Sequence, residues 1–530
     1  MYRYNVNEEF IFCDTVLYEK VDLTIDSSKL FHLDEFNIID NKPVIIYSQI
    51  RTNEYIAGIL DLTRTYGKDN NKYLYLCKPD DKRTPSFLIP YSIPPNFDKS
   101  IQYLYVTFKY NNWNNDIPTG LITSNIGRID VLNNLYEYML YCKSLNQPIQ
   151  KFTKKTIEEI KKHENIIQEI TALHNIPYRN GHIFTVDSTK SVDYDDAISV
   201  HNNVISVYIS HVPIILDYLN LWNSFSRRVS TIYLPDKKRS MLPNVLSDCI
   251  CSLKEKENRI CLVLDIFYDD NCNIIENKFS ICNAKISRNY SYEQPKLLNH
   301  PDFLKIKHIL KVDNSYQMVS KLMIYYNKEC ALKMSHCKKG IFKTLQSNLY
   351  FPKNHIDYIE LFKINASKYD NYENQNYYSH NNKDYQCYLQ ITSPIRRLVD
   401  LLNIYIFTNE FNINKYKEDA FVFYYKWFNE LDYINKTMRY IRKVQSKCKL
   451  ISLFQTNNNE IFKGFTFDKI ERSDKKFHYN VYLPKLNIFT SMTIQDDLKE
   501  YNEYSFKLYM FNCSSNIQNK IKIAYIHKIE

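Results

Sequence analysis

The stretch FTVDSTKSVDYDDAISV, residues 184–200, places four aspartates between two runs rich in apolar residues. They are Asp187, Asp193, Asp195 and Asp196, in the pattern DxxxxxDxDD. Like charges at this density destabilise a folded chain unless positive charge lies among them. Because an apolar run follows Asp196 directly, we expect the group to lie at the start of a strand and to be partly buried. A divalent cation with oxygen ligands, usually Mg²⁺, is one source of the missing positive charge.

Two other interpretations of the acidic stretch compete with a metal site. An EF-hand loop requires glycine at its sixth position and glutamate at its twelfth, and these positions hold Val192 and Ile198, which excludes it. A solvated acidic loop stays open as an alternative. If the carboxylates held two cations about 4 Å apart, one could activate water and the other could stabilise the leaving oxygen of a phosphodiester.

The length and composition of the chain indicate a folded protein of several domains. Its 530 residues suggest two to four domains, and 44% hydrophobic with 24% charged residues are typical of globular proteins. No apolar run of about 18 residues predicts a membrane span, and the start MYRYNVNEEF lacks the apolar segment of a secretory signal. The 13 cysteines form no CxxC pair, which favours reduced thiols and a cytoplasmic location. The net charge of +10 fits a polyanionic partner.

The texture of the sequence changes along the chain. Short strand-like runs extend to about residue 150, residues 153–176 show helical spacing, and AISVHNNVISVYISHV predicts a hairpin that turns at Asn202 and Asn203. A mixed α/β region follows, and the last stretch is strand-only. We predict four domains: a partial or degenerate N-terminal barrel (1–55), a second barrel (56–150), a mixed α/β domain (151–455) and a C-terminal barrel (456–530).

The stretch TSPIRRLVDLLNIYIF, residues 392–407, predicts a helix with Ser393 as its cap and Pro394 at its first position. Arg396 could bind phosphate at such a helix start, or it could make an ordinary ion pair with Asp400 four residues on. A second basic segment has Tyr233 shortly before Lys237, Lys238 and Arg239. An aromatic residue beside basic ones can contact nucleic acid, although most such loops are simply surface.

Three segments together resemble the catalytic (RNB) domain of the ribonuclease II/ribonuclease R exoribonucleases. They are residues 184–200, residues 233–253 (YLPDKKRSMLPNVLSDCICSL) and residues 392–402 (TSPIRRLVDLL), in the order of that family. Upstream, GILDL…KPDDKRTPSFLIP…WNNDIPTGLITSNIGRID is similar to the second cold-shock barrel of the eukaryotic, exosome-nuclease-like branch. Nothing resembling the endonuclease (PIN) domain of that branch precedes the barrels.

The resemblance implies a fold, an activity and a set of site residues. The fold is a mixed α/β RNB domain flanked by N-terminal cold-shock OB-type barrels and a C-terminal OB-type barrel. The activity is 3′→5′ hydrolysis of single-stranded RNA to nucleoside 5′-monophosphates with Mg²⁺ or Mn²⁺. The implied residues are Asp187, Asp193, Asp195 and Asp196 for metal binding and catalysis, Arg396 for catalysis, and Tyr233, Tyr292 and Arg397 for RNA binding. We expect a cytoplasmic monomer without a membrane association or an exosome tether.

Three positions depart from the pattern of the family. Ser320 and Lys321 stand before Asn327 where a glutamate is usual, His211 replaces an aspartate, and Gln390 replaces a histidine. We interpret these changes as slowing catalysis rather than abolishing it. The alternative is a catalytically impaired RNA-binding or regulatory protein, and a structural scaffold is more distant because it has no use for the acidic pattern.

Overall fold

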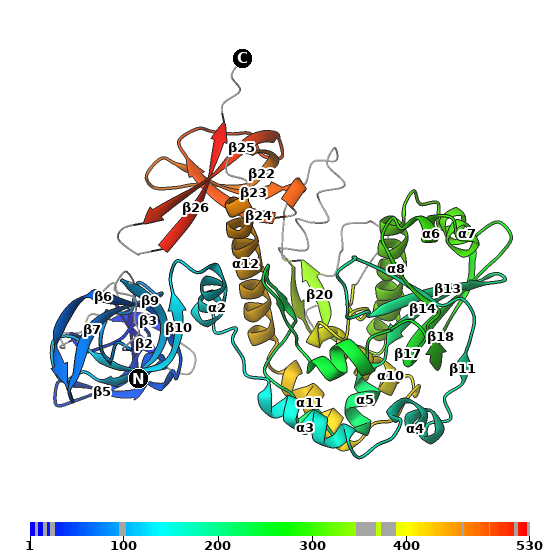
Figure 1. Cartoon of the computed structure of the whole chain (residues 1–530), viewed down its shortest axis with the longest axis horizontal. Coiled ribbons are helices and arrows are strands. Elements are labelled where there is room, and N and C mark those ends of the chain that lie inside the picture. Colours follow the sequence, from blue (N-terminus) through cyan, green and yellow to red (C-terminus); the bar gives the residue numbers. More distant parts are fainter. Residues whose placement is uncertain are drawn as a thin grey trace. The chain divides into compact units, whose positions relative to one another are not determined.

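The computed structural model describes residues 1–5, 9–13, 18–21, 27–94, 102–345, 367–372, 388–456, 460–486, 488–513 and 518–526. These residues divide into two compact units. Unit 1 contains Met1–Asn146, Leu234–Asp236 and Lys443–Glu530, and unit 2 contains Gln147–Tyr233 and Lys237–Arg442. The candidate site lies in unit 2 (Figure 1).

Unit 1 contains one closed barrel and two further antiparallel sheets. The barrel has the strand order β10-β8-β7-β6-β9, and Phe31, Phe87 and Phe108 are buried in its core. Its strands are β6 (Ile56–Asp69), β7 (Lys72–Pro79), β8 (Phe87–Tyr91), β9 (Tyr103–Asn112) and β10 (Thr119–Arg128). Helix α2 (Leu132–Cys142) follows, in a region where the sequence texture predicted strands alone.

The other two sheets of unit 1 come from the ends of the chain. The N-terminal sheet consists of β1 (Tyr2–Asn5), β2 (Glu9–Cys13), β3 (Tyr18–Val21), β4 (Glu35–Ile39) and β5 (Lys42–Tyr47), followed by the short helix α1 (Gln49–Thr52). The C-terminal sheet consists of β22 (Ile461–Glu471), β23 (Phe477–Leu483), β24 (Ile488–Ile494), β25 (Glu503–Cys513) and β26 (Gln518–Ile526). Each sheet has five strands. In the described ladders, β3 and β5 are the edge strands of the N-terminal sheet, and β24 and β26 are those of the C-terminal sheet. The domain bounds 1–55, 56–150, 151–455 and 456–530 stay a prediction.

A seven-stranded mixed sheet forms the centre of unit 2, in the order β11-β18-β17-β14-β13-β12-β19. Its strands are β11 (Tyr178–Arg179), β12 (Phe184–Asp187), β13 (Asp196–His201), β14 (Val204–Ser210), β17 (Asn258–Tyr268), β18 (Ile274–Lys285) and β19 (Arg288–Ser291). Nearly every residue of β14 and β17 is buried, as expected for strands that are covered on both faces. Two small hairpins accompany the sheet, β15 (Ile232–Tyr233) with β16 (Lys238–Arg239) and β20 (Phe342–Leu345) with β21 (Ser367–Asp370).

Helices cover this sheet. Helix α8 lies alongside the strands (Figure 1). The Tyr326 hydroxyl of α8 donates to the Leu262 carbonyl of β17, and Phe279 of β18 contacts both Tyr326 and Phe407 of α10. The helices are α3 (Gln150–Ile160), α4 (Ile166–Leu173), α5 (Val212–Tyr218), α6 (Pro295–Leu298), α7 (Pro301–Leu310), α8 (Ser315–His336), α10 (Leu398–Glu410), α11 (Glu418–Phe428) and α12 (Leu431–Thr456), which continues into unit 1. The helical spacing of residues 153–176 is therefore two helices, because Asn165 caps α4 and interrupts the run.

The hairpin prediction is confirmed and the helix-start prediction is wrong. Strands β13 and β14 pair through the turn at Asn202, whose φ of 48° is a left-handed conformation that asparagine tolerates. Helix α10 begins at Leu398, and Arg397 is its N-cap without a side-chain cap bond. Residues 393–396 form a turn instead, because Asp400 accepts from the Ser393 N–H and an isolated bridge joins Arg397 to Ser230.

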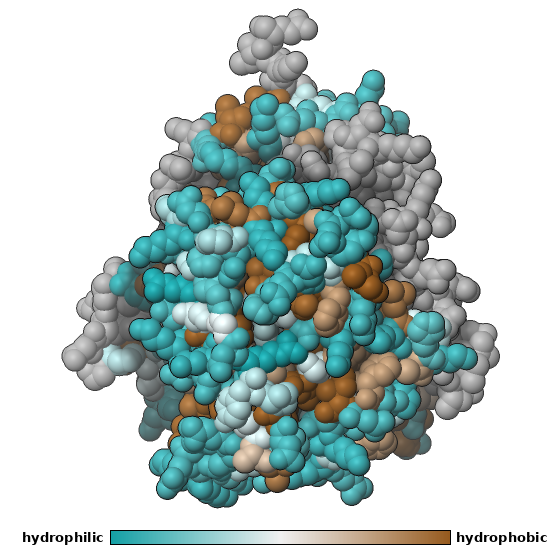
Figure 2. Space-filling model, turned by 90° about the vertical axis from the view of Figure 1, so that its right-hand side faces the viewer, coloured by the Kyte–Doolittle hydropathy of each residue, from teal (hydrophilic) through white to brown (hydrophobic). Residues whose placement is uncertain are grey.

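Among the described residues, no helix combines the length and the apolar character that crossing a membrane would require. On the face of the molecule shown in Figure 2, hydrophilic side chains predominate and hydrophobic ones are scattered among them. Several exposed aromatic residues nevertheless occur in the chain, among them Tyr233 (42% exposed) and Tyr316 (64% exposed).

Candidate active site

The sheet of unit 2 brings the four aspartates to one edge. Asp187 ends β12 and Asp196 begins β13, and these two strands are antiparallel neighbours with Phe184 opposite Ile198. That register places the end of β12 level with the start of β13. The connecting loop is fixed by Ser252, whose hydroxyl accepts from the Tyr194 N–H and donates to the Val192 carbonyl. The expected strand start at a buried Asp196 is therefore confirmed.

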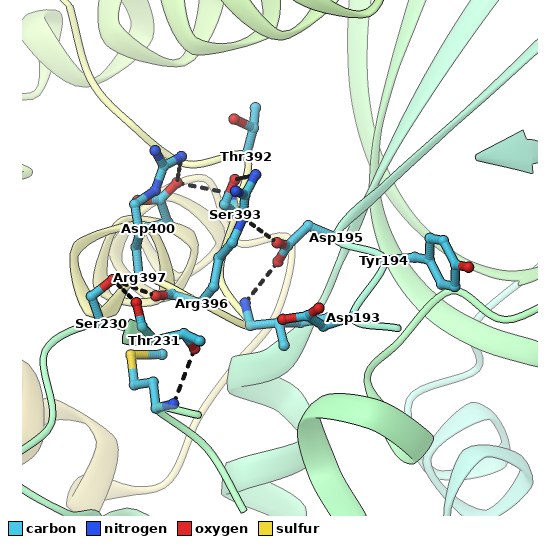
Figure 3. A network of polar contacts seen from close by, with 12 residues as sticks. Asp193, Tyr194, Asp195, Ser230, Thr231, Thr392, Ser393, Arg396, Arg397 and Asp400 are labelled. Carbon is cyan, nitrogen blue, oxygen red and sulfur yellow. Dashed lines mark hydrogen bonds and ion pairs between the residues drawn. The ribbon is translucent and has the colours of Figure 1, made fainter. Parts of the chain in front are cut away.

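Asp195 is held by the turn that carries Arg396 (Figure 3). Its Oδ1 accepts from the Ile395 N–H at 2.8 Å, and its Oδ2 accepts from Arg396 Nε at 2.9 Å. The Arg396 guanidinium also donates to Ser393 Oγ at 3.0 Å, which orients the planar group. Of the two possibilities for Arg396, neither a helix-start position nor a pair with Asp400 occurs. Arg396 instead forms an ion pair with Asp195, which lies 201 residues earlier in the chain.

Asp193 has two partners from the basic segment that follows Tyr233. The Tyr233 hydroxyl donates to Asp193 Oδ2 at 3.0 Å, and Lys238 Nζ lies 3.5 Å from Asp193 Oδ1. Lys238 also pairs with Asp248 at 2.7 Å. Lys238 is thus directed at the acidic cluster, a role that sequence reasoning missed, since only its proximity to an aromatic residue had singled it out.

Asp187 and Asp196 have no such partner. Asp187 Oδ2 is a buried oxygen without a hydrogen bond, and no described residue donates a hydrogen bond to the Asp196 carboxylate. Of the four carboxylates, Asp193 and Asp195 therefore have hydrogen-bond and positively charged partners. Asp187 and Asp196 do not have such partners among the described residues. Within the described residues, no three of these aspartates bring one oxygen each within 4.8 Å of one another.

The pKa values of three carboxyls reflect this arrangement. Burial, together with the neighbouring Asp196 charge, raises the pKa of Asp187 to about 8 against the opposing effect of Arg396. Burial also raises the pKa of Asp195 to about 7 and that of Asp196 to about 6, and Arg396 opposes both shifts. For Asp195 the two hydrogen bonds it accepts show that the ionised form is the one the site is built for. The carboxylates of Asp187 and Asp196 accept no such bonds from the described residues, and only the nearby charges of Arg396 and, for Asp196, Arg397 oppose the effect of their burial.

The turn that carries Arg396 is tied to a second segment of the same unit. The Arg396 carbonyl accepts from the Thr231 N–H at 2.9 Å and from the Ser230 hydroxyl at 2.8 Å. Arg397 points to Asp400, its Nη2 donating at 2.8 Å, and the buried Asp400 also accepts from the Ser393 N–H. Arg397 therefore supports this turn, and its side chain is partly buried.

Tyr292 lies beside Asp187. It directly follows β19, which pairs in parallel with β12, and the Tyr292 N–H donates to the Asp187 carbonyl at 2.9 Å. Burial, and then the charges of Asp187 and Asp196, raise the pKa of the Tyr292 hydroxyl. The exposed ring of Tyr316 lies 5.7 Å from that of Tyr292, so the site has an aromatic pair of which the sequence indicated one member.

The positions that depart from the family pattern have ordinary structural partners. His211 is buried and caps α5 by accepting from the Ile214 N–H, and burial lowers its pKa to about 3, so the ring is neutral. Lys321 Nζ donates to the Leu310 carbonyl at the end of α7, and Gln390 accepts from the Tyr369 hydroxyl. Asn327 accepts from the Ile391 N–H at 2.9 Å, which anchors the segment before Arg396 to α8.

Comparisons with known proteins show that the part of the chain that carries these residues is similar to ribonucleases. The model of the RNB domain matches residues 176–322. Among curated proteins, ribonuclease R of Chlamydia pneumoniae is 25% identical over 319 residues, covering 44% of this chain and 47% of that protein. The exosome complex exonuclease RRP44 of Homo sapiens is 24% identical over 247 residues, covering 44% of this chain and 25% of that protein. The chain thus spans half or less of the length of these relatives, and their similar identities do not separate the bacterial from the eukaryotic branch.

Solved structures with the same fold cover nearly the whole chain. The structure of Mycoplasma genitalium RNase R in complex with ribose-methylated single-stranded RNA has a TM-score of 0.68 at 15% identity and covers 99% of both chains. Yeast Ssd1, a pseudonuclease, has a TM-score of 0.55 at 14% identity, covering 91% of this chain and 70% of that one. Residues 176–322 thus match the RNB domain in sequence, and the chain has a multidomain mixed α/β fold similar to that of ribonuclease R.

Proposed function

We propose that this chain is a 3′→5′ exoribonuclease that hydrolyses single-stranded RNA to nucleoside 5′-monophosphates with the help of Mg²⁺. The observation that carries the proposal is the pair of carboxylates without hydrogen-bond donors among the described residues, Asp187 and Asp196, beside an arginine. A protein gains nothing in stability from such a pair, since burial raises both pKa values and the charge of Asp196 also raises that of Asp187. The similarity to ribonuclease R and RRP44 supports the same activity, and the expected eukaryotic branch, cytoplasmic location and monomeric state stay predictions.

The residues present fit one divalent cation. Lys238 and Arg396 offset the charges of Asp193 and Asp195, which leaves the charge of Asp187 and Asp196, two carboxylates in all, for the metal. Their oxygens are the ligands that Mg²⁺ prefers. We infer that Asp187 and Asp196 bind the ion directly, and that Asp193 and Asp195 position the loop and the arginine around it. When bound, Mg²⁺ supplies positive charge to the phosphate and lowers the pKa of a coordinated water.

Arg396 is the residue of the chain best placed to contact the scissile phosphate. Its side chain is 43% exposed, and its Nη1 has no hydrogen-bond acceptor among the described residues. Since Asp195 and Ser393 hold the other edge of the guanidinium, the free edge is oriented before substrate arrives. A preoriented donor at this position stabilises negative charge that develops on phosphate oxygens during hydrolysis.

Aromatic side chains would position the RNA. Tyr292 and Tyr316 offer ring faces beside Asp187, and Tyr233 lies on the side of Asp193. Bases stack on such rings without regard to sequence. In unit 1, Lys68 lies 4.6 Å from the ring of the exposed Tyr73 on the barrel, a combination that also suits single-stranded RNA. We therefore propose single-stranded RNA as the substrate.

A second function is an RNA-binding protein with impaired catalysis. The observation in its favour is that Ser320 and Lys321 replace an acidic side chain that the resemblance leads us to expect, while Lys321 is bonded to Leu310. Under this alternative the chain binds RNA through charge and aromatic contacts, and chelation of metal leaves that binding unchanged.

The deciding experiment is an RNA hydrolysis assay with matched variants. The purified chain is incubated with 5′-labelled single-stranded RNA with Mg²⁺ or with a chelator, in parallel with Asp187→Asn/Asp196→Asn and with Asp313→Asn as a control at an exposed acid. We expect 5′-monophosphates and progressive shortening from wild type and Asp313→Asn only, and only with Mg²⁺. Intact RNA in every lane, with retained binding, would establish the second function, and equal cleavage by the double variant would exclude this site as the catalytic one.

A further inference from the structure

A second group of metal-binding side chains lies in unit 2, apart from the four aspartates. His182 precedes β12, and His300 and Asp302 lie at the start of α7. One ligand atom from each lies within 4.8 Å of the other two, and all three side chains are partly buried. His182 Nδ1 lies 2.8 Å and His300 Nδ1 lies 3.8 Å from the same oxygen, Asp302 Oδ2.

These distances match the ligand separations of a small metal ion. Nitrogen and oxygen ligands about 2.0–2.1 Å from a tetrahedral Zn²⁺ are about 3.3 Å from one another. The two distances to Asp302 Oδ2, 2.8 Å and 3.8 Å, lie on either side of that value. Small rotations of the His182 and His300 side chains would therefore equalise them.

The hydrogen bonds show which ring nitrogens already have partners. The Asp302 N–H donates to His300 Nδ1 at 3.2 Å, so this nitrogen carries a lone pair that caps α7, and a metal ion would take the place of this bond. The same unprotonated nitrogen lies 3.8 Å from Asp302 Oδ2, so no hydrogen bond links these two atoms. The rings of His182 and His300 stack at 3.9 Å, and the Tyr290 hydroxyl lies 3.4 Å from His182 Nε2. At 2.8 Å from the Asp302 carboxylate, His182 Nδ1 carries the proton of a hydrogen bond, and a cation bound to all three side chains would displace this proton.

We propose that His182, His300 and Asp302 form a binding site for a divalent late first-row transition metal, with Zn²⁺ as the preferred ion. Two imidazoles and one carboxylate are ligands that suit Zn²⁺ and disfavour Mg²⁺, which prefers oxygen alone. The site is distinct from the acidic one, because His182 lies five residues before Asp187 on an extended segment, about 16 Å away. The metal joins the start of β12 to the start of α7, and three protein ligands leave a fourth position for water.

The experiment measures metal bound by the whole chain. Wild type, His182→Asn/His300→Asn and His308→Asn are dialysed against the same free Zn²⁺ concentration, and the metal in each is quantified. His308 lies exposed on the same helix, α7, and serves as the matched control. We expect the double variant to bind one Zn²⁺ per chain fewer than wild type and than His308→Asn. The same deficit must occur in an Asp187→Asn/Asp196→Asn background, where Zn²⁺ at the acidic site is already lost.

A second measurement uses the unaltered chain, so it does not depend on the folding of a variant. Histidines are modified with diethyl pyrocarbonate with and without Zn²⁺, and the modified peptides are quantified by mass spectrometry. We expect Zn²⁺ to protect His182 and His300 several-fold while His308 reacts equally in both conditions. Equal Zn²⁺ stoichiometry in the double variant and wild type, or equal modification of His182 with and without Zn²⁺, would overturn the proposal.

Discussion

Replacing Asp187 with asparagine should stabilise the metal-free protein at pH 8, and at pH 5 the gain should fall to about a quarter of that value. Burial and the charge of Asp196 raise the pKa of Asp187 to about 8, so the folded protein binds this proton more tightly than the unfolded chain does. For a group whose pKa rises on folding in this way, the stability of the protein falls as the pH rises between the unfolded and the folded pKa values. Asparagine keeps the shape of the side chain and removes the charge that causes the loss.

The size of the effect follows from the pKa. A rise from an unfolded value of about 4 to about 8 corresponds to a loss of about 5 kcal/mol at pH 8. Because the Asp187 side chain is partly exposed, water screens the charges, and we expect about a third of this, about 2 kcal/mol. For a unit of this size, a gain of about 2 kcal/mol raises the melting temperature by about 5 °C. At pH 5 the folded protein is protonated at Asp187 but the unfolded chain is ionised, so about a quarter of the gain, about 0.5 kcal/mol, remains, and it disappears below about pH 4.

The assay is thermal melting in a chelating buffer at pH 5 and pH 8, repeated at pH 8 with Mg²⁺. Mg²⁺ should stabilise wild type and not the variant, which removes the difference between them. Asp195→Asn is the contrasting control from the same loop, since Asp195 accepts bonds from Ile395 and Arg396 and an amide can accept through one oxygen only. We expect it to destabilise the protein by about 1 kcal/mol. If Asp187→Asn lowered the melting temperature at pH 8 as Asp195→Asn does, the division of the quartet into paired and unpaired carboxylates would be wrong.

Three further predictions concern activity. Lys238→Met should lower the Mg²⁺ concentration for half-maximal RNA hydrolysis about threefold, since Lys238 offsets part of the negative charge at Asp193; an unchanged Mg²⁺ titration would contradict this. Arg396→Lys keeps the charge and loses the oriented fork, so kcat should fall about 100-fold with a smaller change in KM, as steady-state kinetics would show. At limiting Mg²⁺ the rate should rise with pH from 6 to 8 as the carboxyls of Asp196 and Asp187 ionise, and saturating Mg²⁺ should move this rise to lower pH; a flat pH profile at limiting Mg²⁺ would argue against direct binding by these two carboxyls.

The part of the site that depends on local sequence could be predicted. The alternating apolar residues after Asp196 determine strand β13, and the asparagine at 202 adopts the left-handed turn that ends it. Both features follow from interactions between residues close in the chain. The same holds for the acidic pattern, which drew attention to the loop before its position in the sheet was known.

The parts that depend on distant residues could not be predicted. Ser393 and Pro394 are typical of a helix start, yet bonds from Thr231 and Ser230 to the Arg396 carbonyl hold this segment as a turn. Likewise, Lys238 pairs with Asp193 across a loop and a hairpin. Local preferences of about 1 kcal/mol are easily outweighed by such tertiary bonds, and one sequence carries no signal of the pairing.

The attachment of the Arg396 turn to residues 230–231 has a consequence for how the proposed site would recognise a nucleotide. Tyr233 is two residues beyond Thr231, so the ring and the guanidinium belong to one hydrogen-bonded backbone block. If RNA binds as proposed, the separation between a base on Tyr233 and a phosphate at Arg396 would then be set largely by main-chain geometry. Such a site would select a strand by the distance from base to phosphate and not by the identity of the base.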